Sequence, residues 1–198
     1  MGKIDMADKT TDDVGMGKFI SLILRHKPET VGISLNEHGW ADVSELISGI
    51  RKSGKYIDMA MLERIVAENN KHRYSFNGDR TKIRANQGHS IPVDIELPAA
   101  NPPDVLYHGT ASRFLDSIRE KGILKQNRQY VHLSSDIQTA LEVGKRHGKV
   151  VVLPIDTKKM IGDGYIFYLS VNGVWLCSDI AWKYVKENEI INVGEHYV

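Results

Sequence analysis

Cysteine is almost absent from this sequence, since Cys177 is the only one in 198 residues. The chain can therefore form no internal disulfide and no cysteine-based zinc site. No apolar run approaches the roughly 18 residues of a membrane-spanning helix, and residues 1–15 are polar and acidic rather than signal-like. These absences predict a soluble, cytoplasmic protein with no membrane partner. We expect residues 1–15 to be a disordered lead.

Net charge is also nearly absent, because 26 Lys and Arg residues stand against 25 Asp and Glu residues. No strong overall field therefore attracts nucleic acid. Residues 71–90 are a local exception, since five Lys or Arg residues there accompany a single acid, Asp79. This stretch indicates a basic patch about the size of a hairpin. No acidic cluster offers a magnesium site, so we expect no metal requirement.

A first helix is predicted from about Lys18, because apolar residues recur at helical spacing from there. Pro28 disfavours helical geometry in the residue before it, so Arg25 and His26 should occupy the last turn. Two interpretations are open. These cations either offset the negative end of the helix dipole, or Arg25 and His26 together grip a phosphate.

Two further helices and a hairpin are predicted before residue 90. Asp42 should cap a helix running to about residue 52, and a third helix should span residues 58–69. Residues 74–76 and 82–85 are short strand candidates across a turn at Asn77-Gly78, and Gly39-Trp40 indicates a turn with a buried indole. Three helices closed by a hairpin is the winged-helix plan, which most often binds nucleic acid.

The second half of the chain has a different pattern. Proline and small residues cluster at 97–103, which predicts an interdomain linker. Beyond it we expect short strands at residues 105–107, 131–133, 150–153, 165–168 and 174–176, with helices at 114–121 and 136–147. The whole pattern predicts an α+β chain with one lobe over residues 16–96 and a mixed β lobe over residues 104–198.

Two of these strands carry polar residues. Tyr107-His108-Gly109-Thr110 is expected where a strand ends, with the glycine allowing a ligand close to the backbone. The segment 128–135 repeats the arrangement, with a polar residue inside an apolar strand. Two such strands predict a cleft between them, although a histidine satisfied within the core explains His108 at least as well.

Seven motifs occur in order along the chain. They are Leu24-Arg25-His26-Lys27-Pro28, Gly39-Trp40, His72-Arg73-Tyr74, Ile83-Arg84-Ala85-Asn86-Gln87-Gly88-His89-Ser90, Tyr107-His108-Gly109-Thr110, Val131-His132-Leu133-Ser134 and Asn172-Gly173-Val174-Trp175. This set, over about residues 17–185, resembles the NAD-dependent RNA 2′-phosphotransferase family, whose eukaryotic members finish tRNA splicing. The resemblance implies a winged-helix RNA lobe joined to an ADP-ribosyltransferase-like lobe.

The resemblance also implies the reaction. The partner would be RNA with an internal 2′-phosphate, such as a tRNA-like molecule, and NAD would be consumed as co-substrate, with no metal and no obligate protein partner. The 2′-phosphate attacks C1″ of the nicotinamide ribose, which expels nicotinamide and leaves RNA-2′-phospho-ADP-ribose. The ribose 2″-hydroxyl then attacks that phosphate, giving RNA with a free 2′-hydroxyl and ADP-ribose 1″,2″-cyclic phosphate.

Residue roles follow from the same resemblance. The catalytic set falls on Arg25, His26, Arg73 and Arg128. His26 would either hold a phosphate oxygen or protonate the departing 2′-oxygen. The residues expected to bind NAD are His108, Gly109, Thr110, His132 and Ser134. Those expected to contact RNA are Arg84, Asn86, Gln87, His89 and Ser90. Without the resemblance, Arg73 and Arg128 are ordinary surface arginines and residues 84–90 are a solvated wing.

Related transferases place a glutamate on a later strand, where this sequence has Val174. A phosphate monoester with a second pKa of about 6 is mostly dianionic at neutral pH, so its attack needs no base, and a nearby carboxylate would repel it. Two other functions stay open: ADP-ribosylation of terminal nucleic-acid phosphates, and a non-catalytic RNA- and NAD-binding module. Only the phosphotransferase would release nicotinamide together with a cyclic phosphate.

Overall fold

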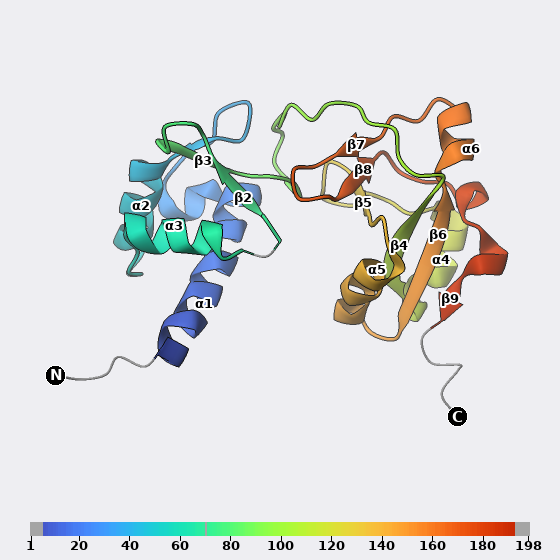
Figure 1. Ribbon diagram of the computed structural model, residues 1–198, viewed down its shortest axis with the longest axis horizontal. Coiled ribbons are helices and arrows are strands. Elements are labelled where there is room, and N and C mark those ends of the chain that lie inside the picture. Colours follow the sequence, from blue (N-terminus) through green and yellow to red (C-terminus); the bar gives the residue numbers. More distant parts are fainter. Residues whose placement is uncertain (1–5, 70, 193–198) are drawn as a thin grey trace. The chain divides into compact units, whose positions relative to one another are not determined.

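Residues 6–69 and 71–192 are described by the computed structural model, with side chains from residue 13 onward. The chain divides into two units, residues 1–96 (lobe 1) and residues 97–198 (lobe 2), and each contains helices and small antiparallel sheets (Figure 1). The fold is therefore α+β. The expected linker at 97–103 belongs to lobe 2, where the Ala100 amide donates to the Phe167 carbonyl over 2.8 Å. Among the described residues no helix is long and apolar enough to cross a membrane.

Helix α1 (Met6–Arg25) is longer than the sequence predicted. Residues 6–15, expected to be disordered, are helical, while residues 1–5 lie outside the described part. Asp13 provides a physical reason, because Arg64 of α3 donates to its carboxylate from Nε over 2.6 Å and from Nη2 over 2.9 Å. The predicted end is confirmed: α1 stops at Arg25, and a 3-10 turn, η1 (Pro28–Val31), follows.

The two capped helices of lobe 1 are confirmed. Helix α2 (Val43–Lys52) begins where the Asp42 carboxylate accepts hydrogen bonds from the amides of Ser44, 2.8 Å, and Glu45, 3.0 Å. Helix α3 (Met59–Ala67) is capped by Asp58 and ends two residues earlier than expected. The three helices and the sheet enclose a core whose fully buried members are Ile20, Ile23, Leu24, Ala41, Leu46, Ile50, Ile57, Leu62, Ile83 and Ala85.

The sheet of lobe 1 has the strand order β1-β3-β2, from β1 (Ala41–Asp42), β2 (Tyr74–Phe76) and β3 (Lys82–Ala85). The β2–β3 hairpin is confirmed, but its loop runs from residue 77 to residue 81. The Asn77 amide donates to the Lys82 carbonyl over 3.0 Å, which closes that loop. The prediction of a buried indole was wrong, because Trp40 is only half-buried. The guanidinium carbon of Arg84 lies over the Trp40 ring, 4.5 Å from its centroid.

Lobe 2 contains two three-stranded antiparallel sheets. The first has the order β4-β6-β9, from β4 (Val105–Ala111), β6 (Val150–Asp156) and β9 (Ile191–Asn192). The second has the order β5-β8-β7, from β5 (Val131–Leu133), β8 (Trp175–Cys177) and β7 (Tyr168–Leu169). Two backbone hydrogen bonds of 2.9 Å between Tyr107 and Ser134 join the sheets.

The strand predictions for lobe 2 were right about position more often than about length. Strands β4 and β6 begin where expected but are longer, and β5 is confirmed. The strand expected at 165–168 is shorter and forms β7, and β9 was not predicted. The helices are α4 (Leu115–Lys121), α5 (Ile137–Gly144) and α6 (Thr157–Gly162). The 3-10 turns are η2 (Ser112–Phe114), η3 (Lys145–His147), η4 (Trp182–Tyr184) and η5 (Glu187–Glu189).

Gly109 corrects an interpretation made from the sequence. It lies inside β4 rather than at a strand end, and a Cβ added there would come within 1.8 Å of the Ala140 carbonyl oxygen in α5. Gly144 is equally confined, since its Cβ would lie 2.9 Å from the Thr110 carbonyl oxygen. These two glycines allow α5 to pack directly on the backbone of β4. Helix packing therefore requires a glycine at position 109, whereas its predicted role at the NAD site stays a prediction.

Candidate active site

The end of helix α1 is held by the segment that follows β3. The Ser90 amide donates to the Arg25 carbonyl over 3.0 Å, and a 2.9 Å hydrogen bond joins Ser90 Oγ to His26 Nδ1. A Cβ on Gly88, whose φ is +86°, would lie 3.6 Å from Nη1 of Arg25. The segment 86–90 therefore packs around Arg25 and His26. The carbonyl of Arg25 is satisfied by a main-chain donor from this segment.

His89 is buried behind these cations, with 1% of its surface exposed. Burial, together with the positive charges of Arg25, His26 and Arg84, lowers the pKa of His89 to about 4. Within the described part of the chain, neither ring nitrogen of His89 has a hydrogen-bond partner. A neutral, enclosed imidazole cannot attract RNA phosphates as a cation. RNA contact by His89 stays a prediction that this geometry does not favour.

Asn86 is also buried, and its side chain is used within lobe 1. Its Nδ2 donates to the His72 carbonyl over 2.6 Å, and its Oδ1 accepts a hydrogen bond from Ser75 Oγ over 2.8 Å. Its amide donates to the carbonyl of Arg73 over 2.8 Å. Asn86 therefore fixes the backbone on both sides of Arg73, which is an arrangement suited to positioning that residue. The predicted RNA contact remains untested.

Arg73 and Arg25 both belong to lobe 1 and both act electrostatically on Tyr74. Burial raises the pKa of Tyr74, and the positive charges of both arginines act against that rise. The Tyr74 hydroxyl donates to the Gly17 carbonyl and is hydrogen-bonded to the Ser21 hydroxyl. Arg25 and Arg73 therefore both lie near Tyr74, and His26 directly follows Arg25 after the end of α1. This group of three residues is called the α1-end cluster below.

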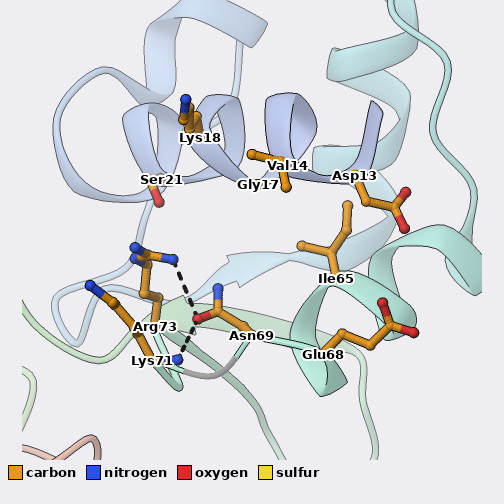
Figure 2. A pocket seen from close by; sticks show the side chains of 10 residues that line it. All are labelled: Asp13, Val14, Gly17, Lys18, Ser21, Ile65, Glu68, Asn69, Lys71 and Arg73. Carbon is orange, nitrogen blue, oxygen red and sulfur yellow. Dashed lines mark hydrogen bonds between the residues drawn. The ribbon is translucent and has the colours of Figure 1, made fainter. Parts of the chain in front are cut away.

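Arg73 also borders a cavity of about 570 Å³, shown in Figure 2. Nη1 of Arg73 is 3.5 Å from Asn69 Oδ1, which also accepts the Lys71 amide over 3.1 Å. Sequence reasoning assigned no role to the cavity residues Lys18, Ser21, Asn69 and Lys71. A signal was present, because Lys18, Ser21 and Arg25 are spaced by three and four residues and so share one helix face.

The other residues predicted to contact RNA lie on the same hairpin. Arg84 stacks on Trp40, and its Nη1 is 3.4 Å from the His38 carbonyl and 3.5 Å from the Glu96 carboxylate. Gln87 is half-buried. Arg84 is close enough to His89 to help lower the pKa of that imidazole. The wing is therefore packed against its own lobe and is not simply solvated.

In lobe 2, two histidines of neighbouring strands have defined tautomers. His108 Nδ1 donates to the His132 carbonyl over 3.2 Å, and His132 Nδ1 donates to the Tyr130 carbonyl over 3.0 Å. A carbonyl can only accept, so Nδ1 of each histidine carries a proton. Burial lowers the pKa of His108, and the nearby cations His147 and Arg128 lower it further, against the hydrogen bond to His132.

Arg128 lies in lobe 2, on the loop before β5, and its side chain is exposed. Thr110 is buried in β4, and Ser134 is held through its backbone bonds to Tyr107. Val174 comes just before β8, and its amide donates to Ser170 Oγ over 3.0 Å. Lobe 2 therefore brings Arg128 near His108, whereas the α1-end cluster belongs to lobe 1. A single phosphate pocket formed by all four catalytic candidates stays a prediction.

The polar groups of the two lobes are better suited to anions than to cations. Across residues 6–69 and 71–192, no group of three or more His, Cys, Asp or Glu side chains is arranged to hold a metal ion. The donors that do come together are guanidinium groups, imidazoles and amides. Such a set can bind an anion through charge-assisted hydrogen bonds.

Comparison with known proteins gives consistent matches. The model of the family described as "RNA 2'-phosphotransferase, Tpt1 / KptA family" matches residues 11–179. A "Probable RNA 2'-phosphotransferase" of Fusobacterium nucleatum subsp. nucleatum is 57% identical over 176 residues, covering 88% of this chain and 98% of that protein. A protein of the same description from Acaryochloris marina is 50% identical, with 88% and 96% covered. Another, from Pseudomonas aeruginosa, is 47% identical, with 92% and 100% covered.

Proposed function

Because the chain belongs to the RNA 2′-phosphotransferase, Tpt1 / KptA family, and is therefore a transferase, we propose that it removes an internal 2′-phosphate from RNA by transferring that phosphate to NAD. The observation that carries the proposal is the α1-end cluster, in which Ser90 is hydrogen-bonded to the His26 ring and Asn86 fixes the backbone next to Arg73. Processing or repair of tRNA-like RNA is a setting in which such a phosphate arises.

The two lobes would divide the work. Three helices and a β1-β3-β2 sheet with a hairpin support a winged-helix lobe that binds RNA. Two small antiparallel sheets joined at Tyr107 and Ser134 support an ADP-ribosyltransferase-like lobe that binds NAD. Arg128 would join the phosphate site from the second lobe.

The residues of lobe 2 fit a ribose and a carboxamide. The Nε2 lone pair of a neutral His108 can accept a hydrogen bond from a ribose hydroxyl or from a carboxamide NH₂ group, and the His132 carbonyl orients that ring. A neutral His108 also avoids repelling the positively charged nicotinamide ring. Thr110 and Ser134 would act through backbone groups of β4 and the segment after β5. Gly109 would act indirectly, by allowing α5 to support β4.

When bound, NAD would supply an electrophilic C1″ with nicotinamide as the leaving group, and then a 2″-hydroxyl nucleophile. The RNA 2′-phosphate forms a bond to C1″ while the bond from C1″ to nicotinamide breaks, which gives RNA-2′-phospho-ADP-ribose. In the second step the 2″-oxygen forms a bond to phosphorus and gives up its proton, while the bond from phosphorus to the RNA 2′-oxygen breaks. A proton must reach that departing oxygen, and the products are RNA with a 2′-hydroxyl and ADP-ribose 1″,2″-cyclic phosphate.

The chain's own residues would act on charge and position. Arginine forks stay charged at all relevant pH values and match the geometry of phosphate oxygens, so Arg25, Arg73 and Arg128 would stabilise the phosphate as its charge redistributes. Losing one such donor typically costs about 3 kcal/mol, or ~10²-fold in rate. His26, oriented by Ser90, would hold a phosphate oxygen or deliver the proton to the 2′-oxygen. The absence of a carboxylate at Val174 suits an attacking group that is already anionic.

The decisive experiment is mass spectrometry of products after the protein is mixed with NAD and a short RNA bearing one internal 2′-phosphate. We expect nicotinamide, RNA with a free 2′-hydroxyl and ADP-ribose 1″,2″-cyclic phosphate. An RNA with only a terminal phosphate serves as the control. If that control is ADP-ribosylated and no cyclic product forms with the 2′-phosphorylated RNA, the enzyme modifies phosphate ends. If no nicotinamide forms with either RNA, the proposal is wrong.

A further inference from the structure

One face of helix α1 connects the α1-end cluster to the cavity of Figure 2. Val14, Lys18, Ser21 and Arg25 are spaced by four, three and four residues, which places them on one side of the helix. Three of them line the cavity, and Arg25 follows Ser21 by four residues. That spacing corresponds to a rise of about 6 Å along the helix. Arg25, Ser21 and Lys18 therefore form a row of polar groups on this face, and the apolar Val14 follows them.

The two ends of the cavity differ chemically. Figure 2 shows Ser21, Lys71, Arg73 and Asn69 gathered at one end, and Asp13 and Glu68 at the other. Asp13 is already bound by Arg64 through two hydrogen bonds of 2.6 and 2.9 Å, so Glu68 is the acid whose charge matters. The end near Arg73 attracts an anion, and the opposite end disfavours one.

The middle of the cavity is apolar. The side chains of Val14 and Ile65 lie there, beside the backbone of Gly17. The cavity volume of about 570 Å³ is within the usual range for small-molecule sites, about 300 to 1,000 Å³. Phosphate donors at one end, an apolar middle and a carboxylate acceptor at the far end together match the parts of one nucleotide.

We propose that this cavity binds a nucleotide adjacent to the one that carries the 2′-phosphate. Its phosphate would lie between Lys18, Ser21 and Lys71, with its sugar and base over Val14 and Ile65. Arg73 borders both sites, and the rise from Ser21 to Arg25 is comparable to one step between consecutive phosphates of an extended strand. This inference rests on the proposed function, because it assumes that the α1-end cluster holds the RNA 2′-phosphate.

The test is equilibrium binding without NAD, measured by fluorescence anisotropy, so that it does not depend on turnover. Oligoribonucleotides with one internal 2′-phosphate are extended by one to three nucleotides on either side. For the wild-type protein we expect the affinity to rise about tenfold on extension in one direction. The double variant Lys18→Ala/Lys71→Ala should lose that gain. Its plot of log Kd against log salt should become shallower by about 0.7 for each RNA phosphate that the variant no longer neutralises.

A matched control is Lys52→Ala, which removes one exposed charge of lobe 1 at the end of α2, away from the cavity. This variant should keep both the gain from extension and the salt dependence of the wild type. The inference is overturned if the double variant and the control behave alike, or if extension on neither side improves binding. Failure of the proposed function would be separate: wild-type protein would then release no nicotinamide, whatever the length dependence of binding.

Discussion

The substitution Asn86→Ala tests whether Asn86 positions Arg73 or contacts RNA. It removes the 2.6 Å bond to the His72 carbonyl and the 2.8 Å bond from Ser75 Oγ, but keeps the backbone bond to Arg73. Each such bond contributes about 1 kcal/mol net, so lobe 1 should lose about 2 kcal/mol of stability. Asn86 is only 4% exposed, so water cannot readily replace the missing amide group. A shift of Arg73 by about 1 Å would cost ~10²-fold in turnover.

Hydrogen exchange of the amides in β2 and β3 gives a readout confined to lobe 1. A loss of about 2 kcal/mol should speed the exchange of those amides roughly 30-fold. The matched control is Gln87→Ala, because Gln87 is the next residue, carries the same amide group and is half-buried. We expect this variant to leave the exchange rates within about threefold of the wild type. Ser75→Ala, which removes one of the two bonds, should give about half the effect in free energy.

A different outcome would refute the positioning role. If Asn86→Ala leaves exchange in the hairpin unchanged while it weakens RNA binding about tenfold, Asn86 contacts the RNA directly. Its internal hydrogen bonds would then contribute nothing measurable to lobe 1. The Gln87→Ala control makes this distinction possible, because it shows what the loss of a more exposed amide does at the same place.

Three further predictions concern other parts of the molecule. Arg25→Ala and Arg128→Ala should slow the second step more than the first, so RNA-linked ADP-ribose should accumulate in single-turnover assays; wild-type turnover in both variants would contradict their roles. Gly109→Ala should lower the free energy of unfolding by at least about 3 kcal/mol, because the new Cβ would lie 1.8 Å from a carbonyl oxygen of α5. Thermal or denaturant unfolding measures this loss. The control Gly78→Ala, whose Cβ would have nothing within 4 Å, should change the stability very little. The pKa of His89 is about 4 in the folded protein and 6.5 in the unfolded chain. Between these pH values the unfolded chain therefore binds a proton that the folded protein does not bind. Stability should therefore fall as the pH drops through that window, and His89→Gln should flatten the slope in denaturant titrations at pH 7 to 4.

Local features of the fold could be predicted well because they depend on residues close together in sequence. Asp42 was predicted as a helix cap and Asp58 as the start of the third helix, and the carboxylate of each accepts hydrogen bonds from amides two or three residues later. The end of α1 before Pro28 follows from the same kind of local constraint. The β2–β3 hairpin was found for this reason too, although its loop is longer than the turn that was expected.

Features that depend on distant partners were predicted poorly. Residues 6–15 were expected to be disordered, but Asp13 pairs with Arg64, which is 51 positions away. Trp40 was expected to be buried, whereas it lies half-exposed beneath Arg84 of β3. No periodicity in sequence indicates which side chain from another element will meet a given residue.

The sequence by itself determined where the candidate chemistry lies, because the spacing of its arginines, histidines and amides resembles one family and comparison with known proteins supports that family. Only the tertiary structure decided which of these residues face inward. Asn86 and His89 belong to the same polar run as Arg84 and Ser90, yet both are buried, and Gly109 is required by a helix that begins 28 residues later. The physical reason is that burial and hydrogen-bond partners are properties of packed elements, whereas residue type and spacing are properties of the chain.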